Sequence, residues 1–130
     1  MQEVEFAQRV WRLMEAILEF GVPSELVRRM MITRLYYAAY HLALLLLRNA
    51  GLTPPTDRSV HQWMLDELQQ RYARTGQMTW AAWNGLQLLR QLRTRADYRV
   101  DLRIRESDVR LAMRLFRTFF DECRRILEVT

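Results

Sequence analysis

The 130-residue sequence has few of the residues that interrupt helices. It contains four glycines and three prolines, so the chain has few places to turn. Leu, Ala, Met, Arg, Glu and Gln, which favour helices, outnumber the β-branched residues. The single cysteine, Cys123, excludes an internal disulfide and a thiolate zinc site, and it favours a reducing compartment. These absences predict one all-helical domain.

Lysine is absent. All 20 basic residues are arginine, and with 15 acidic residues they give a formal net charge of +5. Guanidinium groups bind phosphate oxygens through paired hydrogen bonds, and excess positive charge attracts polyanions. A nucleic acid or nucleotide is therefore one interpretation of the charge. The other is that the arginines form ion pairs along helix surfaces and reflect genome composition or a warm habitat.

The sequence also lacks a long uncharged apolar segment. The most hydrophobic stretch, Leu35 to Leu47, contains a histidine and is shorter than the roughly 18 apolar residues that a membrane span requires. Residues 1–20 carry charged groups throughout, so they lack the apolar core of a signal peptide. We therefore expect a buried helix here and a cytoplasmic protein that does not contact a membrane.

Apolar residues recur at three- and four-residue steps in five segments, which predicts five helices. The expected ranges are Gln2 to Phe20, Leu26 to Asn49, Ser59 to about Arg74, Trp80 to about Tyr98, and Glu106 to Leu127. The first three helices end at glycines, and hydroxyl residues can cap the second and fourth. Residues 99–105 alternate in polarity, but a lone strand would have no partner, so we expect an extended connection. The prediction is an all-α bundle of about five helices, with residues 1–130 as a single domain.

Two stretches of the sequence carry motif-like patterns. The first, Arg34-Leu35-Tyr36-Tyr37-Ala38-Ala39-Tyr40-His41, is similar to the second-helix signature of the HEPN (higher eukaryote and prokaryote nucleotide-binding) family. Leu92-Arg93-Thr94-Arg95-Ala96-Asp97-Tyr98 resembles the Arg-x-x-Ala-Asp-Tyr ending of the fourth helix in one prokaryotic branch, and residues 107–120 resemble the helix that follows. The likeness covers roughly residues 24–127, and its order, spacing and helix placement agree.

The resemblance implies an antiparallel helical bundle that commonly forms a homodimer. Many members are metal-independent ribonucleases, in which an Arg-x(4 to 6)-His motif from two subunits forms one cleft. Counting from Arg93, Tyr98 stands where a histidine would complete that motif. In toxin–antitoxin pairs of this family the partner is often a small nucleotidyltransferase, and Tyr98 could accept a nucleotide from it. No metal ion or other cofactor is expected.

The residues predicted to form the cleft are Arg93, Asp97 and Tyr98. Metal-free cleavage of RNA needs a base, an acid and cations that favour the crowded phosphorane. His41 is the candidate base, because Arg34, Tyr37 and His41 share one stripe of the second helix. If that stripe faces the fourth helix, Asp97 pairs with Arg34 and His41 stands near the arginines. The residues expected to bind phosphate are Arg34, Arg90, Arg95 and Arg99.

Simpler interpretations of the same residues stay open. His41 can instead make a hydrogen bond inside the core, and Arg93 with Asp97 can be only a local ion pair. His61 lies near the place where members of the family often carry a histidine, but the alignment through residues 57–61 can shift, so it is not counted in the site.

The sequence supports two functions. One is a HEPN-type RNA-directed protein, either a metal-independent endoribonuclease or a toxin-like component, and the other is a non-catalytic module that binds nucleotide, RNA or a protein.

Overall fold

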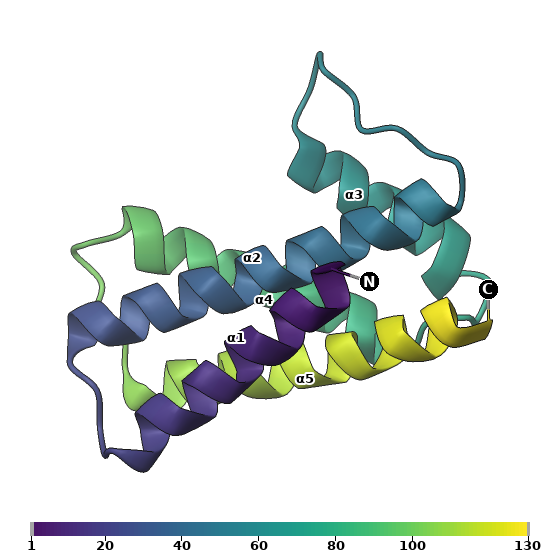
Figure 1. Cartoon of the computed structure of the whole chain (residues 1–130). Helices are drawn as coiled ribbons and strands as arrows, with labels where there is room; N and C mark the ends of the chain where they lie inside the picture. The colour runs from purple at the N-terminus through teal and green to yellow at the C-terminus, as the bar shows by residue number, and fades with distance from the viewer. Residues whose placement is uncertain (1, 130) are drawn as a thin grey trace.

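The computed structural model describes residues 2–129, and over that range the chain is all-helical, without a strand. The five α-helices are α1 (Gln2–Glu19), α2 (Glu25–Asn49), α3 (Val60–Leu68), α4 (Trp80–Tyr98) and α5 (Glu106–Val129). Helices α1 and α4 run in one direction and α2 and α5 in the other, while α3 lies across one end of this bundle (Figure 1). The predicted all-α helical bundle is confirmed.

Helix α2 is the centre of the bundle, since it packs against α1, α3, α4 and α5. Every residue from Leu42 to Leu47 is buried, as expected for a helix covered on several sides. By length and composition α2 could cross a membrane, which corrects the expectation that its apolar segment is too short, because the helix extends beyond Leu35 to Leu47 at both ends. Within this fold 67% of its most apolar window is buried. The prediction of a buried helix is confirmed.

The predicted helix ends are formed by the expected residue types. The Ser24 hydroxyl accepts a hydrogen bond from the Val27 N–H at the start of α2, and Thr79 caps α4 in the same way. Helix α2 ends at Asn49, and Gly51, two residues beyond, has a φ of 85°. This left-handed conformation, which glycine adopts without strain, lets the Leu52 N–H reach the Leu47 carbonyl at 3.0 Å.

The third helix differs from the prediction, because α3 ends at Leu68 and a π-helical turn, η1 (Gln69–Ala73), continues it. Tyr72 in this turn is buried, and its hydroxyl donates to the Leu46 carbonyl at 3.3 Å. Single π-turns inside helices are rare and are frequent at functional sites. The spacing of apolar residues does not distinguish such a turn from an α-helical one.

Arg29 on α2 satisfies carbonyl groups at the end of α4 and just beyond it. Its guanidinium donates to the carbonyls of Arg95, Ala96 and Arg99 at 2.9 to 3.3 Å, and also to that of Leu102. The last carbonyls of a helix have no partner within the helix, and the negative end of the helix dipole attracts a cation. Arg29 therefore fixes the end of α4, which carries Tyr98, against α2.

Arg28 and Glu25 hold the rest of the connection between α4 and α5. The Arg28 side chain is buried and donates to the carbonyls of Pro23 and Ile104 at 2.6 and 2.8 Å. The Glu25 carboxylate accepts from the Ile104 N–H at 3.1 Å. The connection begins with a turn, in which the Leu102 N–H donates to the Arg99 carbonyl at 3.1 Å, so the prediction of an extended segment was wrong for residues 99–102. Side chains of α2 fix the connection, and Arg28 and Arg29 have structural contacts to backbone carbonyls.

We expect Arg29→Met to lower the free energy of unfolding by about 1 to 3 kcal/mol, because carbonyls at the end of α4 lose a charged donor. Methionine keeps the aliphatic stem and a high helix propensity. Urea unfolding followed by circular dichroism measures the change. Arg12→Met, at an exposed position on α1, is the matched control and should change stability little. Equal stability of the two variants would contradict the role of Arg29.

Candidate functional site

The two stretches that resemble the HEPN family lie side by side on α2 and α4. The Thr33 hydroxyl donates a hydrogen bond to Asp97, which joins the two helices directly. The guanidinium carbon of Arg93 lies 5.8 Å from the centre of the Tyr36 ring. Residues separated by about 60 positions in the sequence therefore meet at one surface of the bundle.

Arg93 contacts both of the other predicted cleft residues. Its Nε lies 2.8 Å from Oδ2 of Asp97, and its guanidinium carbon lies 5.4 Å from the centre of the Tyr98 ring. The local ion pair between Arg93 and Asp97 is thus confirmed. Tyr98 is the last residue of α4, so its ring can turn back over Arg93 although the two positions lie far apart around an ideal helix.

His61, at the start of α3, completes this arrangement. Its Nδ1 lies 2.6 Å from the Tyr36 hydroxyl oxygen, and its ring stacks on Tyr40 at 4.6 Å between centres. Burial lowers the pKa of His61 below its usual value near 6.5, and the positive charges of Arg90 and Arg93 lower it further. His61 is therefore neutral at pH 7. We call Tyr36, His61, Arg93, Asp97 and Tyr98 the Arg93 site.

The hydrogen bond between Tyr36 and His61 has two forms. Burial raises the pKa of Tyr36 to about 12, so its hydroxyl keeps its proton at neutral pH. If this hydroxyl donates to Nδ1 of His61, the opposite nitrogen, Nε2, carries a proton and is a donor. If Nδ1 carries the proton and donates to the Tyr36 oxygen, Nε2 has a free lone pair. In this second tautomer His61 can accept a proton from a ligand.

The predicted position of His41 was wrong. The stripe of Arg34, Tyr37 and His41 faces α1, where the Tyr37 ring contacts Phe6 at 6.4 Å. His41 packs edge-on against Tyr37 at 4.3 Å. Burial lowers the pKa of His41, and its charged neighbours Glu3 and Arg48 act on it in opposite directions. It therefore stands beside the first turn of α1, away from the arginines of α4.

The pairing of Arg34 with Asp97, which was expected only if that stripe faced α4, does not form, since Asp97 binds Arg93 and Thr33 instead. Successive residues of a helix are rotated by about 100° around its axis. Thr33 and Tyr36 face α4, so Arg34 and Tyr37, one position further along, point to a different side of α2. The Arg34 guanidinium lies over the Tyr37 ring at 5.7 Å and forms no ion pair within residues 2–129.

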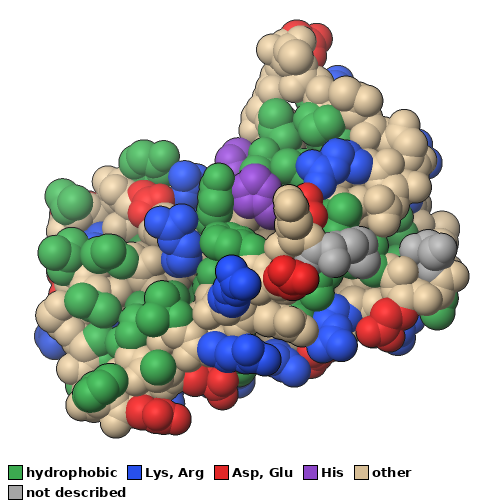
Figure 2. All heavy atoms as spheres, in the orientation of Figure 1, with side chains coloured by type: hydrophobic (Ala, Val, Ile, Leu, Met, Phe, Trp, Pro, Cys, Tyr) green, Lys and Arg blue, Asp and Glu red, His purple; other side chains and the backbone are tan. Residues whose placement is uncertain are grey.

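The other predicted phosphate-binding arginines differ in how they are neutralised. Arg99 pairs with Asp101 at 2.9 Å. Arg90 and Arg95 have no carboxylate partner among the described residues, and the Arg90 side chain only reaches the Gln62 amide oxygen at 3.4 Å. Figure 2 shows the two histidine side chains next to each other on one face, with arginine side chains nearby. Arg90 and Arg95 therefore carry positive charge that no carboxylate among the described residues neutralises.

Comparison of the chain with family models, with curated proteins and with solved structures found no match. The chemistry of the Arg93 site is therefore derived from its own residues. It combines a neutral histidine, a guanidinium group and an exposed tyrosine hydroxyl at one surface.

His61 and Tyr36 were not among the predicted site residues. His61 follows the proline-containing loop after α2, and its contacts with Tyr36 and Tyr40 depend on how α3 folds back across α2. The available signal was that His61 is one of only two histidines in the chain and lies near a histidine position of the resembled family. Spacing along the sequence shows no such contact between separate helices.

We expect Arg93→Met to raise the pKa of His61 toward its usual value, because a nearby positive charge is removed and Asp97 loses its partner. NMR titration of the two histidine rings measures this directly. His41 is the internal control, since Arg93 is not among the charges that act on it, and its pKa should stay the same. An unchanged pKa of His61 would show that the charge of Arg93 does not act on it, and would leave burial and Arg90 as the causes of the lowering.

Proposed function

We propose that this chain is a HEPN-type RNA-directed protein that cleaves RNA without a metal ion. The observation that carries the proposal is that Tyr36 joins His61 to the guanidinium of Arg93: its hydroxyl oxygen lies 2.6 Å from Nδ1 of His61, and its ring centre lies 5.8 Å from the guanidinium carbon. The ring of Tyr98 contacts the same guanidinium at 5.4 Å. Two further points support it. The HEPN-like stretches on α2 and α4 adjoin each other, and the surrounding surface has arginines without carboxylate partners.

In the proposed reaction, Nε2 of His61 takes the proton of a ribose 2′-hydroxyl. The 2′-oxygen then forms a bond to the adjacent phosphorus, and the bond from phosphorus to the 5′-oxygen breaks. The Tyr98 hydroxyl gives its proton to the departing 5′-oxygen, and exchange with water restores both side chains. The products are a 2′,3′-cyclic phosphate and a 5′-hydroxyl end, so no oxidant, reductant or metal ion is required.

Arg93 has the electrostatic role in this proposal. Its Nε is held by Asp97, which leaves the other two guanidinium nitrogens for non-bridging phosphate oxygens. A fixed cation beside the phosphorane stabilises the charge that develops there. Arg90, whose positive charge also acts on His61, extends the positive surface and would bind a flanking phosphate.

We expect purified protein to cleave single-stranded RNA in EDTA, and His61→Asn and Arg93→Met each to slow cleavage by about 100-fold or more. His41→Asn is the matched control, since His41 faces α1, and it should retain activity. Gel analysis of the end groups checks for the cyclic phosphate. Cleavage that depends on His41 but not on His61 would reject this assignment.

A non-catalytic module is the alternative, and one observation favours it. In the tautomer where the Tyr36 hydroxyl donates to His61, Nε2 is a donor and cannot act as a base. The same side chains then form a phosphate-binding surface. Absence of cleavage together with RNA binding that weakens as salt rises, and that weakens in Arg93→Met, would support the binding module instead.

The proposed protein is a homodimer, and its exposed apolar side chains suggest the face that pairs. Large hydrophobic residues are exposed along the α1–α2 hairpin: Phe6, Leu13, Phe20, Val22, Leu26, Met30 and Tyr37. Figure 2 shows hydrophobic side chains gathered at the end where, in Figure 1, α1 ends and α2 begins. Extended exposed apolar surfaces typically mark interfaces. A second copy on this face would place two Arg93 sites close together.

A nucleotidyltransferase antitoxin is the proposed protein partner. Tyr98 is 66% exposed, so its hydroxyl is accessible to another enzyme. Transfer of a nucleotide to this hydroxyl would place a bulky anion beside Arg93 and remove the proposed proton donor. Modification of Tyr98 would therefore stop cleavage.

We expect the protein to be a dimer by light scattering, and Leu26→Glu with Met30→Glu to give a monomer. Two carboxylates in the α2 face would have to be buried without partners in a dimer. Leu88→Glu is the matched control, because Leu88 is similarly exposed but lies on α4, outside the hairpin, and it should leave the dimer intact. A dimer that survives the double substitution would assign the interface to another face.

A further inference from the structure

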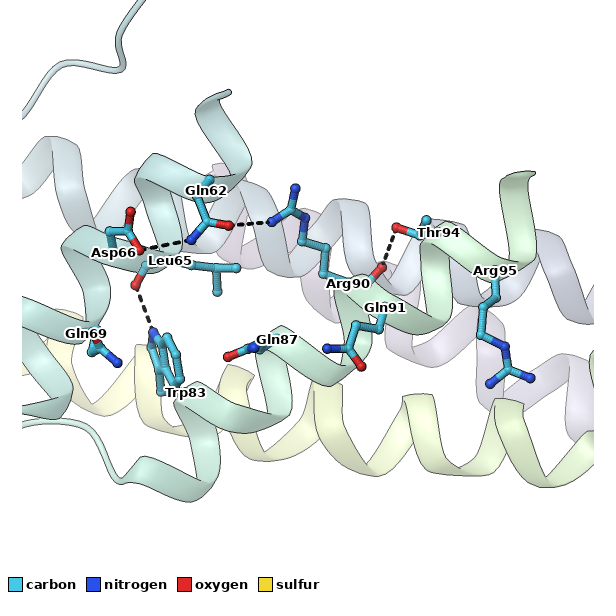
Figure 3. Close-up of a pocket in the computed structure, with 10 residues that line it drawn as sticks. All are labelled: Gln62, Leu65, Asp66, Gln69, Trp83, Gln87, Arg90, Gln91, Thr94 and Arg95. Carbon is cyan, nitrogen blue, oxygen red and sulfur yellow. Dashed lines mark hydrogen bonds between the residues drawn. The ribbon is translucent and has the colours of Figure 1, made fainter. Parts of the chain in front are cut away.

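A cleft between α3 with its π-turn and the outer side of α4 lies next to the Arg93 site (Figure 3). Its volume is about 480 Å³, within the roughly 300 to 1,000 Å³ of ligand-binding pockets. Leu65 and Trp83 supply its apolar surface, and the Trp83 indole N–H donates to the Leu65 carbonyl at 2.9 Å. The indole is thereby held in place and has no free donor of its own.

Four of the eight polar residues that line this cleft are glutamines. Gln69, Gln87 and Gln91 have side chains without a hydrogen-bond partner among the described residues. Figure 3 shows Gln69 and Gln87 extending toward Trp83 from opposite sides of the view, with Gln91 one turn further along α4. Each amide offers donors and an acceptor at the same time. Such a cleft suits an uncharged planar ligand whose edge carries both donors and acceptors.

Arg90 connects this cleft to the Arg93 site. It lines the cleft and has no carboxylate partner, and its positive charge also acts on His61 and Tyr36. The guanidinium is therefore placed to hold a phosphate between the two sites. Gln69 is the first residue of the π-turn, which widens the helix at the far end of the cleft.

From this arrangement we infer that the cleft is a recognition subsite for an adenine base of single-stranded RNA, next to the cleaved phosphate. Glutamine amides pair with the N6 and N7 edge of adenine through two hydrogen bonds, and an indole is a stacking surface for a base. Gln87 supplies the amide, with Gln91 beside it, and Arg90 holds the linking phosphate. This inference rests on the proposed RNA function, and it adds a preference for RNA with an adenine next to the cleaved phosphate.

The test compares oligoadenylate with oligouridylate of equal length, both with 2′-fluoro sugars so that they cannot be cleaved. We expect wild-type protein to bind oligoadenylate about 5- to 100-fold more tightly in fluorescence anisotropy. The double variant Gln87→Leu, Gln91→Leu should bind the two oligomers almost equally, with unchanged affinity for oligouridylate. Gln70→Leu is the matched control, since Gln70 is an exposed glutamine of the π-turn outside the cleft, and it should keep the preference.

A second measurement separates the cleft from the RNA function. Adenosine 5′-monophosphate should quench tryptophan fluorescence in wild-type protein and not in Trp83→Phe. Equal binding of the two oligomers, or no quenching by the nucleotide, would overturn the adenine subsite even if cleavage of RNA occurs. Quenching at Trp83 in a protein that neither binds nor cleaves RNA would refute the proposed function and leave adenine recognition by the cleft.

Discussion

The hydrogen bonds from Arg29 to the carbonyls at the end of α4 are the constraint on which the site depends. A helix end needs partners for its carbonyl groups, and here a side chain of the central helix provides them. They fix the last turn of α4 at a defined height along α2, so that Asp97 meets Thr33 and Arg93 meets Tyr36. The arginines that make the sequence basic therefore fall into two groups. Arg28 and Arg29 bind backbone carbonyls, while Arg34 and Arg90 have no carboxylate partner among the described residues.

The fold was predictable because its signals are local. The spacing of apolar residues predicted the helices, and hydroxyl caps and glycines predicted where they begin and end. Because few residues interrupt helices, few arrangements of the chain were possible. The part of the site that lies within one turn of α4 was predictable for the same reason, since Arg93 and Asp97 are four residues apart and their ion pair is local. The π-turn was not predictable, because α- and π-turns bury the same residue types.

His41 was assigned to the site because the face of α2 that meets α4 was placed one residue away from its actual position. Two stripes of side chains run along that helix: one is Arg34, Tyr37 and His41, and the other is Thr33, Tyr36 and Tyr40. Spacing alone does not decide which stripe meets α4. Arg29 belongs to the second stripe, so its hydrogen bonds select the orientation. The histidine beside the arginines is consequently His61, which arrives from α3 and is adjacent to the site only in three dimensions.

The position of His61 on α3 has a consequence for dynamics. Within the described chain, α3 is a nine-residue helix that contacts only α2, α4 and the π-turn, and it follows a loop with two prolines. The four long helices bury most of the core without it. Segments with few buried contacts open at a lower free energy than the whole domain. Local opening of α3 would therefore separate the histidine from Tyr36 and dismantle the cleft between α3 and α4 at once, while the bundle stays folded.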